Sequence, residues 1–76
     1  MSPLSICRPG DKVVIREICG GAGIRSKMEA MGFLPGEQMM VVSASGGPIL
    51  VILHGSRVGI GRGMAGKILV SPESGS

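Results

Sequence analysis

The sequence predicts a mostly β fold, in which about five short strands form a small barrel and one short helix is inserted after the first strand. Runs of residues with high strand propensity are short, glycine and proline turn signals separate them, and one segment has the apolar spacing of a helix. The chain has 76 residues, which corresponds to one small domain that buries only about 60 to 65% of its unfolded surface. We therefore expect a thin core.

The first strand is expected over residues 12–18. The turn signal Pro9-Gly10-Asp11 precedes it, and the β-branched residues that follow favour an extended backbone. Gly20 and Gly21 then interrupt the strand, because glycine is unfavourable inside one.

The inserted helix is expected directly after these glycines. Ile24, Met28 and Met31 recur at positions i, i+4 and i+7, so they share one helix face. Arg25 and Glu29 form an i, i+4 pair of opposite charge on another face. The segment therefore predicts a short amphipathic helix.

The end of this helix has its own signal. Gly32 stands where a helix C-terminus favours a residue of positive φ. Pro35-Gly36 then supplies a turn in which a residue of fixed φ is followed by a permissive one. We expect the helix to stop sharply and the chain to turn directly into a strand.

The remaining strands follow in quick succession. Residues 38–44 and 49–53 are expected to form a hairpin around Gly46-Gly47-Pro48, residues 57–60 a short strand, and residues 67–70 the last strand. Between the last two, a glycine-rich bend favours a single 3₁₀ turn around Met64-Ala65. This order is typical of a partly open barrel of the SH3-like type, with one domain over residues 4–71 and a flexible tail over residues 72–76.

The strand at 49–53 is apolar on both faces. Ile49, Val51 and Leu53 alternate toward one side, and Leu50 and Ile52 toward the other. A strand of a small barrel should be apolar on its inner face only. Either the inserted helix or a partner protein is therefore expected to cover the outer face of this strand.

Composition weakens the case for nucleic-acid binding. The net charge is +3, the basic residues are scattered singly, and Phe33 is the sole aromatic residue, whereas single-strand binders stack bases on aromatic side chains. The cluster Arg57, Arg62 and Lys67 keeps a nucleic-acid-associated barrel open as an alternative.

The sequence also contains few residues suited to metal binding or catalysis. His54 is the single histidine, the two cysteines Cys7 and Cys19 are far apart, and the acidic residues are dispersed, so no metal cage is predicted. Weak metal carriage through His54, Cys7 or Cys19 stays open. Nucleophilic catalysis needs an oriented base beside the nucleophile. We expect neither an enzyme nor a bound cofactor, and two reduced thiols.

No segment predicts membrane insertion or export. The longest apolar run, residues 49–53, is far shorter than the roughly 20 residues that cross a bilayer. Residues 1–4 lack the features of a secretory signal. A soluble, cytoplasmic protein is expected.

The run Met31-Gly32-Phe33-Leu34-Pro35-Gly36 at the end of the expected helix resembles the FeoA family, which typically has Leu-Gly-Leu/Phe-x-Pro-Gly there. Weaker matches with the right spacing lie at Leu4, Pro9-Gly10-Asp11, residues 15–18, Gly20-Gly21, residues 24–28, residues 47–51, residues 57–60, and Ala65 with residues 67–70. The resemblance covers about residues 4–71.

This resemblance implies an SH3-like accessory protein of bacterial ferrous iron transport, which binds the cytoplasmic part of the membrane G-protein permease FeoB. Together with the two-sided strand, it predicts a partner-binding surface made of the helix and the outer face of the 49–53 strand. Its expected residues are Ile24, Arg25, Lys27, Met28, Glu29, Met31, Leu50 and Ile52. A homodimer stays open.

The same resemblance has two limits. Residues 61–64 depart from the family, whose members often carry Lys and Glu there, so a charge-dependent contact at this place is not implied. The barrel also occurs as the C-terminal module of metal-dependent repressors, behind a DNA-reading helix-turn-helix domain that is not expected here. A nucleic-acid- or metal-associated module of that kind is the alternative function.

Overall fold

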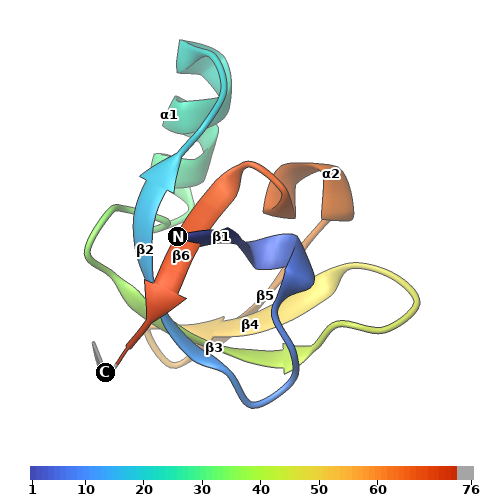
Figure 1. Ribbon diagram of the computed structural model, residues 1–76. Coiled ribbons are helices and arrows are strands. Elements are labelled where there is room, and N and C mark those ends of the chain that lie inside the picture. The colour runs from blue at the N-terminus through green and yellow to red at the C-terminus, as the bar shows by residue number, and fades with distance from the viewer. Residues whose placement is uncertain (74–76) are drawn as a thin grey trace.

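The computed structural model describes residues 1–73. Along the chain the elements are β1 (Ser2–Pro3), the 3₁₀ helix η1 (Leu4–Ile6), β2 (Lys12–Ile18), α1 (Ala22–Ala30), β3 (Gln38–Ser43), β4 (Ile49–Leu53), β5 (Ser56–Ile60), α2 (Arg62–Ala65) and β6 (Ile68–Pro72). Figure 1 shows the strands wrapping around a common centre, with α1 standing at one end of the barrel.

All strand pairs are antiparallel, in the order β1-β6-β2-β3-β4-β5. Over residues 1–73 this is a six-stranded sheet with β1 and β5 as its two edges, so the barrel is not closed. The mostly β, partly open barrel with one inserted helix is thus confirmed. β2 and β4 have the predicted bounds, and the other three predicted strands differ at their ends by one or two residues.

The sixth strand is the part that the sequence pattern did not indicate. β1 has only two residues, which pair with Val70 and Leu69 of β6. A strand of this length carries no detectable alternation, and Pro3 removes one donor. Its pairing depends on a segment at the opposite end of the chain.

The core is formed by inward-facing residues at alternate strand positions. Its fully or almost fully buried members include Val13 and Ile15 of β2, Met39 and Val41 of β3, Ile49, Val51 and Leu53 of β4, and Ile68 and Val70 of β6. Phe33, the sole aromatic residue, has no exposed surface. Leu4 of η1 and Ala65 of α2 complete one side of the same cluster.

The turn between β4 and β5 sets the register of that hairpin. His54 and Gly55 have φ values of 53° and 79°, so both central residues have the positive φ of a type I′ turn. Leu53 therefore lies opposite Ser56, and Val51 opposite Val58.

The last segments differ in detail from expectation. The bend before β6 is a four-residue α-helix, Arg62–Ala65, in place of a 3₁₀ turn. Of the expected flexible tail, Pro72 ends β6 and the Glu73 amide donates a hydrogen bond to the Lys12 carbonyl at 3.0 Å, while residues 74–76 lie outside the described residues. Over residues 1–73, no helix has the length and apolarity that crossing a bilayer requires.

Candidate partner-docking surface

α1 is tied to the core at its C-terminal end. Gly32 has a φ of 94°, as predicted, and its amide donates to the Glu29 carbonyl at 2.9 Å. The next amide, of Phe33, reaches back to the Met28 carbonyl, also at 2.9 Å. These two bonds form a Schellman motif, whose usual apolar contact joins the third-last helical residue to the second residue after the cap. Met28 and Phe33 occupy those two positions and both belong to the core cluster.

Met28 is therefore not part of the protein surface. Its side chain is only 2% exposed, although the sequence analysis included it among the partner-binding residues. The reason is positional: the Schellman motif directs Met28 toward Phe33 and hence into the barrel. We remove Met28 from the candidate surface.

The other helix residues lie where a partner can reach at least part of them. Arg25, Lys27 and Glu29 are exposed. Ile24 is half-buried and packs against the core cluster. Among residues 1–73, the one ion pair found joins His54 to Glu37, so the expected Arg25 and Glu29 pair has its helical spacing but no close contact.

The outer face of β4 is half-covered, and its own sheet covers it. Ile52 lies between Met40 of β3 and Arg57 of β5. Leu50 leans over Gly59 of β5, because a Cβ atom built at Gly59 would stand 3.4 Å from Leu50 Cδ2. Both side chains of β4 are half-buried.

α1 does not cover this face. Its C-terminal glycine, Gly32, faces Leu53 and His54 at the turn that ends β4, and Figure 1 shows the helix projecting from the barrel end, away from the middle of β4. The structure therefore divides the predicted residues into two places: those of α1 at the barrel end, and Leu50 and Ile52 on the sheet.

The sequence analysis missed Leu34, an exposed residue at the barrel end beside α1. Met31, the C-cap residue of α1, is 39% exposed, and Leu34, two residues after Gly32, is 40% exposed. Lys27 is four residues before Met31 and so lies on the same side of the helix. We call Lys27, Met31 and Leu34 the helix-end surface. The exposure of Leu34 could have been predicted from the motif. Two apolar residues follow Gly32, and only the first of them, Phe33, can occupy the buried Schellman position.

Beside this surface the contact of His54 with Glu37 joins the β4–β5 turn to the segment before β3. His54 Nε2 and Glu37 Oε2 are 3.4 Å apart. The His54 side chain is 58% exposed and the Glu37 side chain 35%. A pair this exposed contributes little stability. It places polar groups at the rim of an apolar patch.

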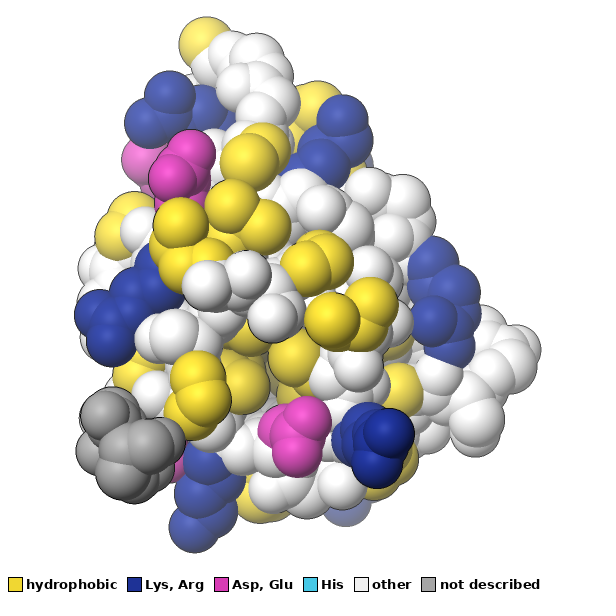
Figure 2. Space-filling view, viewed as in Figure 1, with side chains coloured by type: hydrophobic (Ala, Val, Ile, Leu, Met, Phe, Trp, Pro, Cys, Tyr) yellow, Lys and Arg dark blue, Asp and Glu magenta, His cyan; other side chains and the backbone are white. Residues whose placement is uncertain are grey.

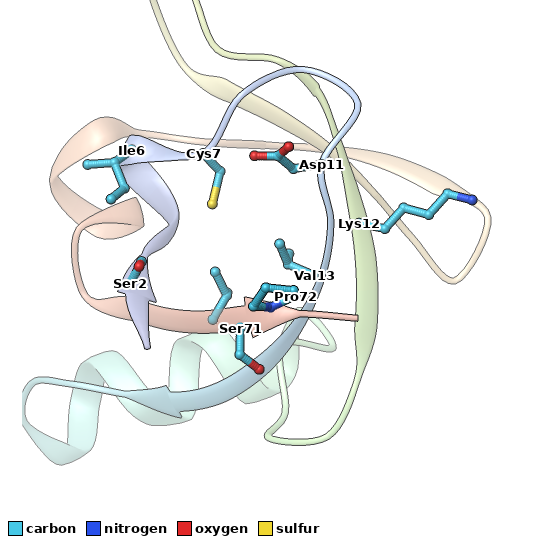
Figure 3. Close-up of a pocket in the computed structure, with 9 residues that line it drawn as sticks. Ser2, Ile6, Cys7, Asp11, Lys12, Val13, Ser71 and Pro72 are labelled. Carbon is cyan, nitrogen blue, oxygen red and sulfur yellow. The ribbon is translucent and has the colours of Figure 1, made fainter. Parts of the chain in front are cut away.

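A second apolar region lies on the face with β1, η1 and β6, where Figure 2 shows hydrophobic side chains gathering. Here Ile6 is 65% and Met1 73% exposed. A cavity of about 270 Å³ is lined by Ser2, Ile6, Cys7, Asp11, Lys12, Val13, Val70, Ser71 and Pro72 (Figure 3).

The thiol of Cys7 borders this cavity. Figure 3 shows its sulfur pointing into the space that the Asp11 carboxylate borders. Burial, and secondly the negative charge of Asp11, raise the pKa of the Cys7 thiol above its ordinary value of 9.0. The protonated thiol is a poor nucleophile and metal ligand. Over residues 1–73, no three His, Cys, Asp or Glu side chains come together as a metal site would need.

Comparisons with known proteins agree with this geometry. The family model described as the FeoA domain matches residues 2–72. A protein of Methanocaldococcus jannaschii whose name carries the designation Fe(2+) transport protein A is 34% identical over 70 residues, which are 92% of this chain and 85% of that protein.

Solved structures give the same result. A crystal structure described as an iron uptake regulatory protein (FeoA) superposes with a TM-score of 0.86 at 40% identity, over 92% of this chain and 93% of the other. A manganese-dependent transcriptional repressor reaches a TM-score of 0.85 at 22% identity, over 92% of this chain and 40% of its own, which shows a shared fold alone. The family model spans almost the whole described barrel, and we conclude that this chain belongs to the FeoA domain family.

Proposed function

We propose that this protein is an accessory protein of Fe²⁺ uptake that binds the cytoplasmic part of the FeoB permease through its helix-end surface. The role is recognition of a protein partner, with no reaction carried out by the chain itself. Membership of the FeoA domain family supports the link to ferrous iron transport.

One observation carries the choice of surface. Met31 and Leu34 expose large apolar side chains on a segment that the Schellman motif and the buried Phe33 hold in a single geometry. A preorganised apolar patch binds with little loss of conformational freedom. Arg25, Lys27 and Glu29 surround it with charge, as expected of a polar rim around an apolar contact.

Leu50 and Ile52 stand apart from this patch. They are half-buried on the sheet, where Met40 and Gly59 adjoin them. We propose them as a subsidiary contact, which a large partner could reach together with the helix end.

The test is a titration of the isotope-labelled protein with the purified cytoplasmic part of FeoB from the same organism, followed by NMR. Leu34→Asp should weaken binding at least tenfold, because a carboxylate then enters the apolar contact. Ile6→Asp is the matched control, since Ile6 is also an exposed apolar residue but lies on the face with η1. Absence of binding by the unmodified protein at high micromolar concentration would contradict the proposal, as would equal weakening by both variants.

The alternative of a nucleic-acid- or metal-associated module has weaker support. The manganese-dependent transcriptional repressors share the fold at 22% identity, and this chain spans only 36 to 40% of their length. Binding of short duplex DNA that falls steeply with salt would favour it over the permease.

A further inference from the structure

β5 is an edge strand with unpaired backbone groups. The type I′ turn makes Leu53 and Ser56 a hydrogen-bonded pair, and such pairs alternate along an antiparallel ladder. Val58 and Ile60 therefore direct their backbone groups toward β4. The N–H and C=O groups of Arg57 and Gly59 point away from β4.

These outward groups have no protein partner within residues 1–73. Neither residue takes part in a hydrogen bond outside the ladder, and no other strand lies beside β5. Arg57 and Gly59 are both exposed. An edge of this kind can accept a further strand, whose main chain supplies the missing hydrogen bonds.

The part of the sequence that contains β5 carries charge of one sign only. From position 38 to position 72 the chain has no Asp or Glu, whereas it carries Arg57, Arg62 and Lys67. Arg57 lies near the start of β5, and Arg62 follows its end, where its guanidinium donates to the Ala44 carbonyl. Two carboxylates flank this stretch in sequence: Glu37, which is paired with His54, and Glu73, which follows the end of β6. An occupant of this edge therefore meets Arg57 near the start of β5, and Arg62 follows the other end of the strand.

We infer that the edge of β5 binds an extended, acidic segment of a partner protein by strand addition. The added strand pairs with the N–H and C=O groups of Arg57 and Gly59, and its Asp or Glu side chains face Arg57 and Arg62. Gly59 has no side chain, so the incoming main chain can approach closely, and Leu50 beside it offers an apolar contact. We expect the permease to supply that segment, and only this identification rests on the proposed function.

A second copy of this chain fits the edge less well. Self-pairing of two β5 strands around Val58 would bring Arg57 of both copies near each other, and like charges at close range across a sheet are unfavourable. The acidic strand removes this conflict.

Two substitutions of one residue separate the backbone contact from other effects. Gly59→Pro deletes the outward N–H, and proline is tolerated on an edge strand where the N–H is not part of the ladder. Gly59→Ala is the matched control, because it keeps the N–H and its Cβ would meet only an ordinary contact with Leu50, at 3.4 Å. Both folded variants should keep the dispersed amide spectrum of the sheet.

The probe is an acetylated and amidated octapeptide of alternating valine and glutamate, with a lysine-for-glutamate peptide for comparison, each titrated by NMR at low salt. We expect the glutamate peptide to shift the Arg57 and Gly59 amides and to slow their hydrogen exchange, with at least tenfold weaker binding by Gly59→Pro and unchanged binding by Gly59→Ala. The lysine peptide should not bind. If Gly59→Pro fails to fold, Arg57→Glu serves instead and should weaken binding at least tenfold.

Equal binding by the proline and alanine variants, or shifts confined to α1, would overturn the inference. So would protection of Arg57 and Gly59 that rises with protein concentration without peptide, because that result identifies a second copy. The same two variants titrated with the permease fragment separate the two proposals. If Gly59→Pro leaves binding of the permease fragment unchanged and Leu34→Asp weakens it, only the proposed function is supported. If the peptide binds at β5 but the fragment does not bind at all, only the edge site is supported.

Discussion

The Phe33 amide donates a hydrogen bond to the Met28 carbonyl at 2.9 Å, and the side chains of both residues lie in the hydrophobic core. One backbone bond thus joins the end of α1, the longer of the two α-helices within residues 1–73, to the sole aromatic residue of the sequence. This link explains why the neighbouring residues Met31 and Leu34 are exposed: the chain uses Met28 and Phe33 for the core and reverses direction between them at Gly32.

The first prediction concerns Gly32. Gly32→Ala should destabilise the protein by about 1 to 2 kcal/mol, because an L residue at a φ of 94° is strained. Its Cβ would also stand 3.4 Å from Leu53 Cδ2. Urea unfolding followed by circular dichroism measures the change.

Gly23 supplies the matched control for this substitution. It lies inside α1, and a Cβ there would meet no atom within 4 Å. Gly23→Ala should therefore stabilise the protein by about 0.5 to 1 kcal/mol through helix propensity. A loss of stability of similar size in both variants would show that the positive φ of Gly32 is not the cause.

The second prediction concerns Phe33. Phe33→Ala should cost about 3 to 5 kcal/mol, because it leaves a cavity in a fully buried site. Small domains have a free energy of unfolding of about 5 to 15 kcal/mol, so much of the population should unfold at moderate temperature. Thermal unfolding measured by calorimetry tests this expectation.

Leu34→Ala is the comparison for Phe33→Ala. Leu34 follows Phe33 directly but is 40% exposed, so we expect a change within about 1 kcal/mol. If the two variants were equally unstable, Leu34 would have a packing role that its exposure does not indicate.

The third prediction concerns the β4–β5 turn. His54→Val should destabilise the protein by about 1 to 2 kcal/mol, because a β-branched residue is strongly disfavoured at a φ of 53°. His54→Asn tolerates that conformation and should keep the stability of the unmodified protein to within about 0.5 kcal/mol. The two variants compared by urea unfolding isolate the backbone term, and equal losses would assign the effect to the contact with Glu37.

The fourth prediction concerns pH and Cys7. The folded protein raises the pKa of this thiol above 9.0, so at high pH the unfolded chain gives up the proton more readily than the folded one does. The contribution of Cys7 to stability is therefore fully present below the pKa of the unfolded chain, 9.0, and declines as the pH rises above it and through the higher pKa of the folded protein. Urea unfolding between pH 7 and pH 10, in a Cys19→Ala background, should show a decline that is smaller when Cys7→Ala is added. An identical decline in both proteins would contradict the assignment to Cys7.

Part of the proposed docking surface could be predicted from sequence, and part could not. The spacing of Ile24, Met28 and Met31 correctly places them near one side of α1, yet Met28 is buried, Ile24 half-buried and Met31 exposed. Helical periodicity gives the angle of a side chain around the helix axis. It does not tell where along that axis the barrel begins, and α1 buries Met28 near its C-terminal end fully but Ile24 near its start only in part.

For β4, the strand that is apolar on both faces, the sequence likewise predicted one part of the structure and not another. Alternation along residues 49–53 correctly separates the core residues from Leu50 and Ile52. The sequence analysis expects either the helix or a partner to cover the outer face of this strand. The structure shows that the sheet itself covers part of that face, because Leu50 lies over Gly59.

The sequence by itself determined the features that depend on close neighbours along the chain: the bounds of β2 and β4, the stop of α1 at Gly32, and the hairpin of β3 and β4. Turn chemistry, strand propensity and capping act over a few residues, so each can be recognised in a short stretch of sequence. Only the tertiary structure decided the pairing of β1 with β6, the burial of Met28 and the open edge of β5. These depend on which distant segments arrive beside them, because the free energy of burial and of ladder hydrogen bonds belongs to the assembled sheet and to no single segment.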